Sequence, residues 1–215
     1  MSSLLLIILS YFYGSLPFGV FIGKKLKGID IREFGSGNIG AANAFRTLGP
    51  AGGIAVLLCD MSKGILPVLL ARFFAASDAL VPLLQVIAGV TAILGHNYSI
   101  FLKFKGGKGI ATSFGVIIAL NWWIALMCFS VWGLMVLLTR YSSVGSLSGS
   151  LALPAFMVIF KQPVPFIAFG IISCAFAFYA HRGNIKKLLK GTELKITEKA
   201  GKEDAPREES DARAS

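Results

Sequence analysis

Charged residues are scarce in this sequence. Asp, Glu, Lys and Arg make up 15% of the 215 residues, hydrophobic residues make up 55%, and the mean hydropathy is +0.71. The apolar residues come in blocks of about 17 to 25, the length that crosses a bilayer. This composition excludes a soluble globular fold, which needs polar residues interleaved along each element. We therefore expect an all-α integral membrane protein.

Cysteine and histidine are also rare. Cys59, Cys128 and Cys174 fall singly in separate apolar blocks, which gives neither a disulfide framework nor metal-ligand spacing. His96 and His181 are the two histidines, and they leave too few ligands for a zinc site. We expect no metal and no cofactor. The net charge is +10, but the basic residues lie in loops between apolar blocks, which favours anionic headgroups or phosphorylated substrates over nucleic acid.

The apolar runs predict six blocks, at 3–22, 52–74, 79–95, 110–138, 144–160 and 164–180. The fourth block would be about 43 Å long as one helix, against a hydrocarbon core of about 30 Å. Asn121, followed by Trp122 and Trp123, has the character of a polar turn beside interfacial aromatics. We therefore divide this block into helices at 110–120 and 122–138, which gives about seven transmembrane helices.

Charge asymmetry predicts the sidedness of these spans. With the N-terminus outside, all but three of the 21 Lys and Arg residues fall in segments on the cytoplasmic side, as the positive-inside rule requires. The exceptions are Lys63, Arg72 and Lys161. We expect the C-terminus in the cytoplasm, a polytopic membrane domain over residues 1–196, and a disordered charged tail over 197–215 that has nothing apolar to bury.

The first of three polar, glycine-rich segments on that side runs from Gly35 to Arg46. Asn38 is expected to cap a short helix that ends at Gly49, and free N–H groups at such a glycine-rich start attract phosphate. Asn43 and Arg46 are three residues apart, so an amide and a guanidinium would converge on one face. The alternative is a flexible re-entrant turn with a lipid-facing Arg46.

The second segment spans residues 95–112 and places Lys108 among glycines directly before a helix. A point cation beside exposed amides suits phosphate, although the P-loop pattern itself is absent because Gly109 replaces the required Ser or Thr. For Lys103 and Lys105 the alternative is a loop held by anionic lipid. The third segment begins at His181 and continues through Asn184, which is expected to cap a short surface helix, to Glu193. His96 and His181 could instead be ordinary interfacial histidines.

Two further features lie inside or beside the spans. Asp60 and Lys63 are three residues apart within the second block, where charge is expensive. They are expected to pair, either as a structural salt bridge or to position the glycine-rich loop. The strip of small residues at 142–150 has Gly145 and Gly149 at the spacing of close helix packing, although Ser142 and Ser143 lie level with the polar segments.

At these segments the chain resembles the bacterial acyl-phosphate:glycerol-3-phosphate acyltransferase family, the PlsY type. Residues 35–49, 95–112 and 181–195 resemble its three cytoplasmic motifs, and Asp60, Lys63, Gly64 and the Gly14-Ser15-x-Pro17 helix also agree. The resemblance covers about the first 196 residues. It departs where Ala42 replaces a usual threonine and Ser99 a usual proline.

The resemblance implies transfer of a fatty acyl group from acyl phosphate to the sn-1 hydroxyl of glycerol 3-phosphate, giving lysophosphatidic acid and phosphate in the first step of phospholipid synthesis. It implies a bacterial inner-membrane enzyme with its active site facing the cytoplasm, in contact with membrane lipid and with the enzyme that makes acyl phosphate. The catalytic residues implied are Ser36, Asn38, Lys108 and His181. The substrate-binding residues implied are Gly37, Asn43, Arg46, His96, Gly106, Gly107, Thr112, Ser143, Asn184 and Glu193.

The main rival is a transporter or carrier of a phosphorylated small molecule, in which Asp60 and Lys63 would form a site at mid-membrane depth. Nearly all of the candidate residues lie at one membrane face instead, which favours an enzyme acting on one soluble and one lipidic substrate. A second rival is a scaffold whose basic loops only grip lipid.

Overall fold

The chain folds into a bundle of α-helices in a computed structural model that describes residues 2–196 and 198. The longer helices are α1 (Ser2–Ser15), α2 (Phe18–Lys27), α4 (Pro50–Phe74), α5 (Val81–Asn97), α6 (Ile110–Leu120), α7 (Trp122–Thr139), α8 (Ser142–Ile159) and α9 (Val164–Ala180). The shorter elements are α3 (Ala41–Leu48), α10 (Arg182–Leu189) and the 3₁₀ turns η1 (Ile31–Glu33), η2 (Asp78–Leu80) and η3 (Ile100–Leu102). The all-helical prediction is confirmed.

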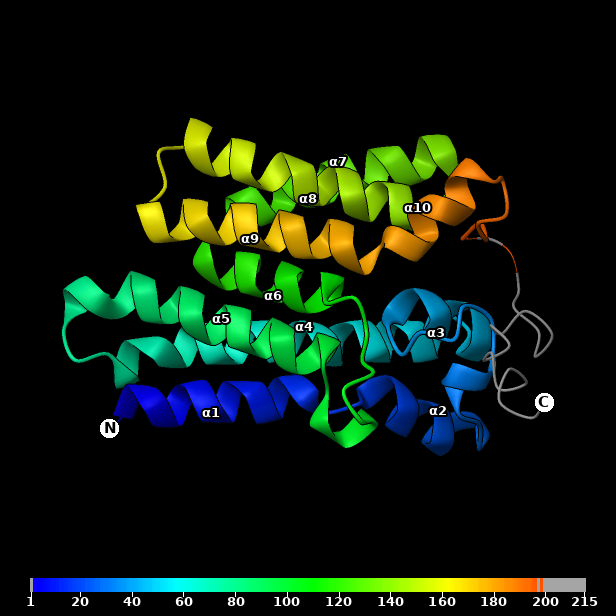
Figure 1. The fold of residues 1–215 in the computed structure, drawn as a ribbon, viewed down its shortest axis with the longest axis horizontal. Coiled ribbons are helices and arrows are strands. Elements are labelled where there is room, and N and C mark those ends of the chain that lie inside the picture. Colours follow the sequence, from blue (N-terminus) through cyan, green and yellow to red (C-terminus); the bar gives the residue numbers. More distant parts are fainter. Residues whose placement is uncertain (1, 197, 199–215) are drawn as a thin grey trace, which may run out of the picture.

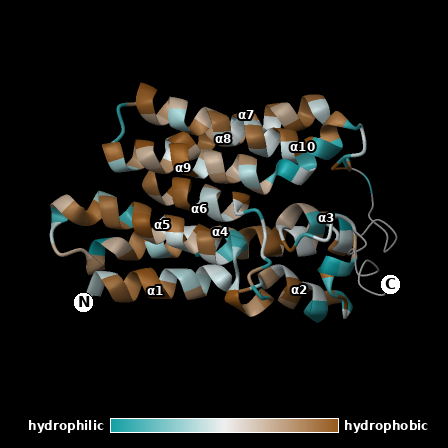
Figure 2. Cartoon of the chain, in the orientation of Figure 1, coloured by the Kyte–Doolittle hydropathy of each residue, from teal (hydrophilic) through white to brown (hydrophobic). Residues whose placement is uncertain are grey.

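The helices form two groups with α6 between them (Figure 1). On one side α1 and α4 pack with α5, and on the other α7 packs with α8 and α8 with α9. A buried apolar cluster joins the groups, and its members include Val116 of α6, Met157 of α8 and Phe169 of α9. The outer faces are apolar, while the polar residues gather at the end that holds α2, α3 and α10 (Figure 2).

Several helix pairs approach closely at glycines. A Cβ atom at Gly14 would lie 2.2 Å from the carbonyl oxygen of Ala92, and one at Gly64 would lie 2.1 Å from that of Thr112. On α8 a Cβ at Gly145 would lie 2.8 Å from the carbonyl oxygen of Trp132. The small-residue strip therefore packs α8 against α7, as its spacing predicts.

The division of the fourth apolar block at Asn121 is confirmed, because α6 ends at Leu120 and α7 begins at Trp122. The side chain of Asn121 accepts a hydrogen bond from the N–H of Ile124 and so caps α7. Its amide also donates to Gln162 Oε1 at 3.1 Å. This contact ties the α6–α7 turn to the α8–α9 turn at one end of the bundle.

The chain is a multi-pass integral membrane protein by the length and composition of its helices. Five segments are long and apolar enough to cross a membrane, and a sixth is added if α9 and α10, bent by 56°, count as one span. The 11-residue α6 is about 16 Å long at about 1.5 Å per residue. Helix α6 is shorter than the segments that are long enough to cross a membrane. The seventh crossing therefore stays a prediction.

Candidate active site

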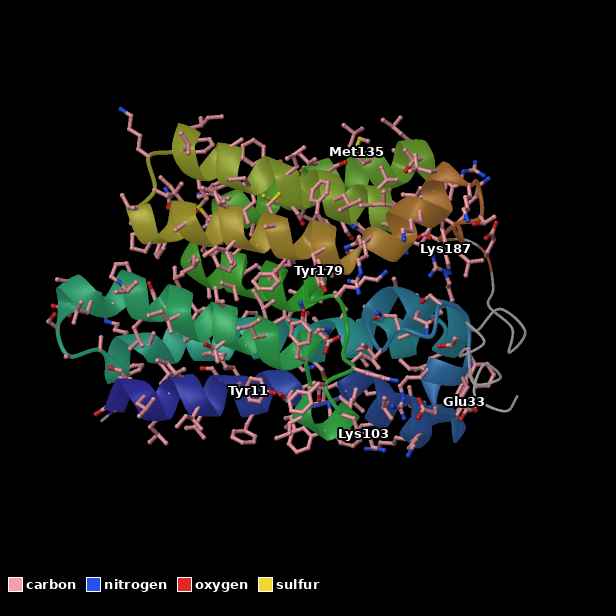
Figure 3. All side chains as sticks on the ribbon, in the orientation of Figure 1. Tyr11, Glu33, Lys103, Met135, Tyr179 and Lys187 are labelled. Atoms are coloured by element: carbon pink, nitrogen blue, oxygen red, sulfur yellow. The ribbon has the colours of Figure 1, made fainter. Side chains whose placement is uncertain are left out.

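A cavity of about 280 Å³ opens among the three polar segments and continues between the helices. Its polar wall contains Ser36, Asn38, Asn43, Arg46, Asp60, His96, Lys108, Ser142, Ser143, His181, Asn184, Lys187 and Glu193. Its deeper wall is mainly apolar and includes Leu57, Met61, Phe114, Ile117, Cys128, Phe129, Trp132 and Leu153. Figure 3 shows Lys187 on α10 near the end of the bundle where the polar segments meet.

Asn43 organises the first segment from within. Its side-chain amide donates to the carbonyl oxygens of Ile31 (2.8 Å), Asn38 (2.9 Å) and Phe34 (3.2 Å), and its Oδ1 accepts from the N–H of Ser36 (3.0 Å). Asn43 is 1% exposed. Its hydrogen-bonding groups are therefore used to shape the loop, and the expected convergence of Asn43 with Arg46 on a ligand is not what this geometry shows.

Asn38 lies outside α3, contrary to the prediction that it caps this helix. The N-cap is Gly40, two residues later, and Asn38 Oδ1 accepts from the N–H of Gly40 at 2.9 Å. This is an Asx turn, in which an Asn side chain hydrogen-bonds the backbone two residues on, so Asn38 Oδ1 serves the turn before the helix. The predicted end at Gly49 before Pro50 is confirmed, with Gly49 at φ +84°.

Arg46 reaches the C-terminal part of the described chain. Its Nη2 donates to the carbonyl oxygen of Leu194 at 3.0 Å, and its Nε donates to that of Lys195 at 3.4 Å. Burial lowers the pKa of the Arg46 guanidinium, while Glu193 raises it. Arg46 is therefore a cation of the cavity wall, and the reading in which it faces lipid is wrong.

Lys108 and Asn184 connect the second and third segments. Lys108 Nζ donates to Asn184 Oδ1 at 2.6 Å, and Asn184 Nδ2 donates to Glu193 Oε1 at 2.7 Å. Ser143 Oγ donates to the same Glu193 oxygen at 2.9 Å. Burial lowers the pKa of Lys108 to about 8, with Arg46 and Lys187 acting in the same direction and Glu193 opposing them.

The residue at the N-cap of α10 also differs from the prediction. His181 occupies the N-cap position and Asn184 lies in the first turn, where its side chain bridges Lys108 and Glu193 instead of capping the helix. His181 Nδ1 lies 2.7 Å from the carbonyl oxygen of Ala177. Because a carbonyl only accepts, Nδ1 carries the hydrogen, and Nε2 of the neutral ring is left as an acceptor.

Four of the predicted substrate-binding residues lie off the cavity wall. Gly106 and Gly107 fold back on α5, where their N–H groups donate to the carbonyl oxygens of Asn97 and His96, both at 3.0 Å. Thr112 is fully buried, and its Oγ1 has no partner among the described residues. Gly37 sits at φ +68° in the first loop and shapes the backbone there.

The predicted pairing of Asp60 and Lys63 is confirmed at 2.7 Å, and His96 joins it from the neighbouring helix α5. Lys63 Nζ lies 3.2 Å from His96 Nδ1. Within residues 2–196 and 198 no group of three His, Cys, Asp or Glu side chains is placed to hold a metal.

Sequence reasoning missed the deeper wall on α8. Ser146, Gly149, Ser150 and Leu153 line the cavity there. They follow Ser142 and Ser143 at helical spacing, so extending that face by two turns would have found them. Leu57, three residues before Asp60, and Met61, directly after it, also line the cavity and were missed.

The sequence is similar to known proteins over most of its length. A family model described as Glycerol-3-phosphate acyltransferase matches residues 4–191. A glycerol-3-phosphate acyltransferase of Trichormus variabilis is 44% identical over 206 residues, covering 90% of this chain and 91% of the relative. One of Desulforamulus reducens is 44% identical over 198 residues, covering 92% and 97%.

Two solved structures are also similar. The glycerol 3-phosphate form of PlsY, an integral membrane glycerol 3-phosphate acyltransferase, superposes with a TM-score of 0.84 at 39% identity, covering 91% of this chain and 96% of that one. The lysophosphatidic acid form of PlsY gives a TM-score of 0.82 at 38% identity, covering 91% and 95%.

Proposed function

The chain belongs to the glycerol-3-phosphate acyltransferase family, and from this premise we propose that its acyl donor is an acyl phosphate. The enzyme acylates glycerol 3-phosphate to lysophosphatidic acid. The sn-1 hydroxyl is the acceptor in this proposal, and inorganic phosphate is the second product. A soluble or membrane-associated enzyme that makes acyl phosphate would supply the donor.

One observation supports this reaction above the others: the two cations Arg46 and Lys108 line a cavity whose deeper wall is apolar. The wall residues on α8 run from Ser142 to Leu153, about 16 Å of helix at about 1.5 Å per residue. Such a cavity suits a molecule with an anionic head and a long acyl chain. Two anionic head groups, one from each substrate, would share the cationic end.

The catalytic assignment follows from these positions. The side chains of Ser36 and Asn38, which line the cavity, would together with Lys108 bind the donor phosphate and the oxyanion that develops on the acyl carbonyl. Arg46 would bind the phosphate of glycerol 3-phosphate, and Asn43 would hold the first loop in shape for both. His181, Asn184, Glu193 and Ser143 would close the site from the third segment and α8.

The chemical step is a direct transfer. The acceptor oxygen bonds to the acyl carbonyl carbon, and the bond from that carbon to the phosphate oxygen breaks. The hydroxyl proton passes to a phosphate oxygen of a substrate, or to Nε2 of His181, which the Ala177 carbonyl leaves as an acceptor. An acyl phosphate is already activated, so positioning and charge stabilisation supply most of the catalysis.

The decisive experiment is acyl transfer by the purified protein in detergent. Palmitoyl phosphate and labelled glycerol 3-phosphate should give labelled lysophosphatidic acid, whereas palmitoyl-CoA at the same concentration should not. Equal or better use of palmitoyl-CoA would overturn the proposed donor. A transporter would instead move glycerol 3-phosphate into vesicles without acylating it, which flux across proteoliposomes would reveal.

Sidedness is proposed from charge. Lys24, Lys25, Lys27, Arg32 and Arg46 precede α4 at the end that also holds α10, so this end would face the cytoplasm of a bacterium and the cavity would open there. A periplasmic reporter fused at Asn121 should be active and one fused at Thr197 silent. The reverse pattern would refute this orientation.

A further inference from the structure

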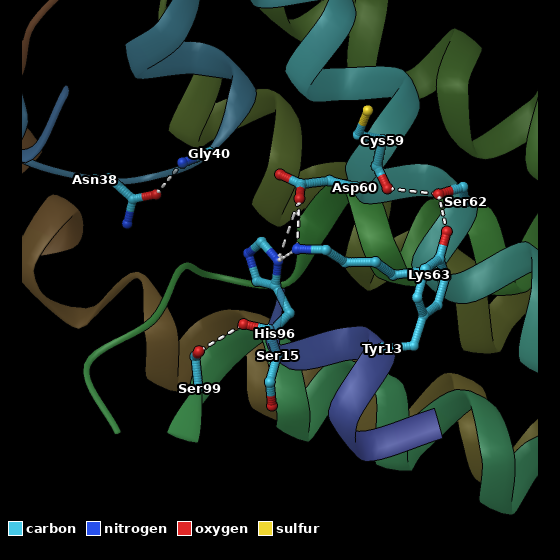
Figure 4. Close-up of polar contacts among 10 residues, drawn as sticks. All are labelled: Tyr13, Ser15, Asn38, Gly40, Cys59, Asp60, Ser62, Lys63, His96 and Ser99. Atoms are coloured by element: carbon cyan, nitrogen blue, oxygen red, sulfur yellow. Dashed lines mark hydrogen bonds and ion pairs between the residues drawn. The ribbon is translucent and has the colours of Figure 1, made fainter. Parts of the chain in front are cut away.

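Three ionisable side chains meet inside the bundle at the cavity wall. Lys63 Nζ lies 2.7 Å from Asp60 Oδ1 and 3.2 Å from His96 Nδ1, and the three groups converge in Figure 4. Lys63 is 0% exposed, Asp60 1% and His96 3%. The Lys63 ammonium also lies 5.0 Å from the centre of the Phe18 ring, so its surroundings are fixed on several sides.

The donor and acceptor roles in this group decide the tautomer of His96. An ammonium has three donors and no acceptor, so His96 Nδ1 must accept from Lys63 and cannot carry a hydrogen. The neutral ring then has its hydrogen on Nε2. Asp60 Oδ1 is 3.6 Å from Nδ1, too far for a hydrogen bond that would favour the other tautomer.

The Nε2 edge of His96 faces the glycine-rich loop that carries Lys108. A Cβ atom at Gly107 would lie 2.1 Å from Nε2, so only glycine lets the loop pass this close. The N–H of Gly107 donates to the carbonyl oxygen of His96 at 3.0 Å, which fixes the loop to the same residue. His96 and Lys108 both line the cavity.

A purely structural role explains the pair poorly. Burying an ion pair is costly, and apolar side chains of similar size usually stabilise a core as well or better. Asp60 and His96 are both wall residues, and Asp60 Oδ2 has no hydrogen-bond partner in the described part of the chain. The group therefore lies at the cavity wall, with hydrogen-bonding capacity left over.

We propose that Asp60 and Lys63 are positioning residues that hold His96 in its Nε2–H tautomer, so that His96 donates a hydrogen bond to an oxygen of the anionic substrate bound beside Lys108. Asp60 holds the Lys63 ammonium in place, and this ammonium donates a hydrogen bond to His96 Nδ1. The ring hydrogen of His96 is then on Nε2, where it can be donated to the ligand. This inference rests on the proposed function for the identity of the ligand, but the tautomer itself is a property of the ligand-free protein.

Nitrogen NMR of the full-length protein labelled with ¹⁵N-histidine tests the tautomer directly. With two histidines in the chain, the His181→Gln variant assigns the His96 ring. We expect a protonated Nε2 and an unprotonated Nδ1, and addition of glycerol 3-phosphate or inorganic phosphate should shift the Nε2 resonance. A protonated Nδ1 in the ligand-free protein, or an Nε2 resonance that neither addition moves, would overturn the proposal.

Kinetics of paired variants test the positioning role. Asp60→Asn combined with Lys63→Met removes both charges together, which avoids leaving one buried ion unpaired. We expect this folded double variant to show both His96 tautomers and to lose about ten- to a hundredfold in kcat, the effect of weakening one hydrogen bond to a charged group. Lys63→Arg keeps a cation that only donates and should retain most of the rate.

Tyr13→Phe is the matched control, because Tyr13 makes a neighbouring, partly buried polar contact with Ser62 of α4 at 2.7 Å (Figure 4) but does not touch His96. It should leave the rate and the tautomer unchanged. A double variant with unchanged kcat and an unchanged tautomer would refute the inference. A wild-type protein that is inactive with palmitoyl phosphate would refute the proposed donor instead, and leave the NMR result to stand alone.

Discussion

The Lys108 ammonium donates a 2.6 Å hydrogen bond to Asn184 Oδ1 across 76 residues of sequence. Glu193 accepts from the other end of the same amide and from Ser143. One continuous set of hydrogen bonds therefore joins the glycine-rich loop before α6, the first turn of α10 and the start of α8.

Removing the cations of the cavity wall should abolish turnover without unfolding the protein. Arg46→Ala and Lys108→Ala each remove a positive charge where phosphate oxygens would bind. We expect acyl transfer to fall by far more than tenfold, which corresponds to more than about 1.4 kcal/mol of transition-state stabilisation. Lys25→Ala is the control, since Lys25 is exposed on α2 and away from the cavity. Folded variants that keep more than about a tenth of the activity would contradict the assignment.

Activity should decline at alkaline pH because Lys108 loses its charge there. Burial lowers the pKa of Lys108 to about 8, so the ammonium is present below that pH and is lost as the pH rises through it. The profile of kcat/KM, which reports the substrate-free enzyme, should therefore fall above about pH 8. Lys108→Arg keeps its charge to far higher pH.

The Lys108→Arg variant, if active, should lack this alkaline decline. An identical decline in that variant would assign the titration to another group. Acyl phosphate hydrolysis without enzyme must be subtracted at each pH.

The last residues of the chain should divide into an essential and a dispensable part. Arg46 binds the carbonyl oxygens of Leu194 and Lys195, and the N–H of Ile196 donates to that of Arg140 at 2.9 Å. A stop codon after Lys190 removes these contacts and Glu193, and should abolish activity. A stop codon after Ile196 keeps them and should leave activity intact. Apart from Glu198, the tail predicted to be disordered lies outside the described residues. Equal rates for both truncations would remove the third segment from the site.

Acyl transfer should proceed without a cysteine nucleophile. Cys128 lines the cavity, but its neighbours on that wall, Phe129 and Trp132, supply no base, and a reactive thiolate needs a base or positive surroundings. A variant with all three cysteines replaced by alanine should therefore keep its rate within about tenfold.

The same variant should lose stability, on the order of 1 kcal/mol from Cys128, which packs in the core. The matched experiment incubates the wild-type protein with labelled palmitoyl phosphate and no acceptor. A stable labelled adduct on the protein would show a covalent intermediate.

The sequence determined the features that depend on local patterns. Hydropathy predicts the helices and the break at Asn121, because membrane thickness limits helix length. Helical period predicts the ion pair between Asp60 and Lys63, since residues three apart share a face. Glycine-rich polar segments at one end of the spans indicate a phosphate site, and their motifs indicate the family.

Only the tertiary structure decided which partners these residues find. Asn43 turns inward to hold its own loop, Asn184 bridges two segments instead of capping a helix, and His96 meets Lys63 from another helix. The family resemblance implies a substrate-binding role for Thr112, but this residue is buried away from the cavity. The reason is physical: a pattern along the chain fixes a side chain's face on its own helix, but the group it meets depends on how helices far apart in sequence pack.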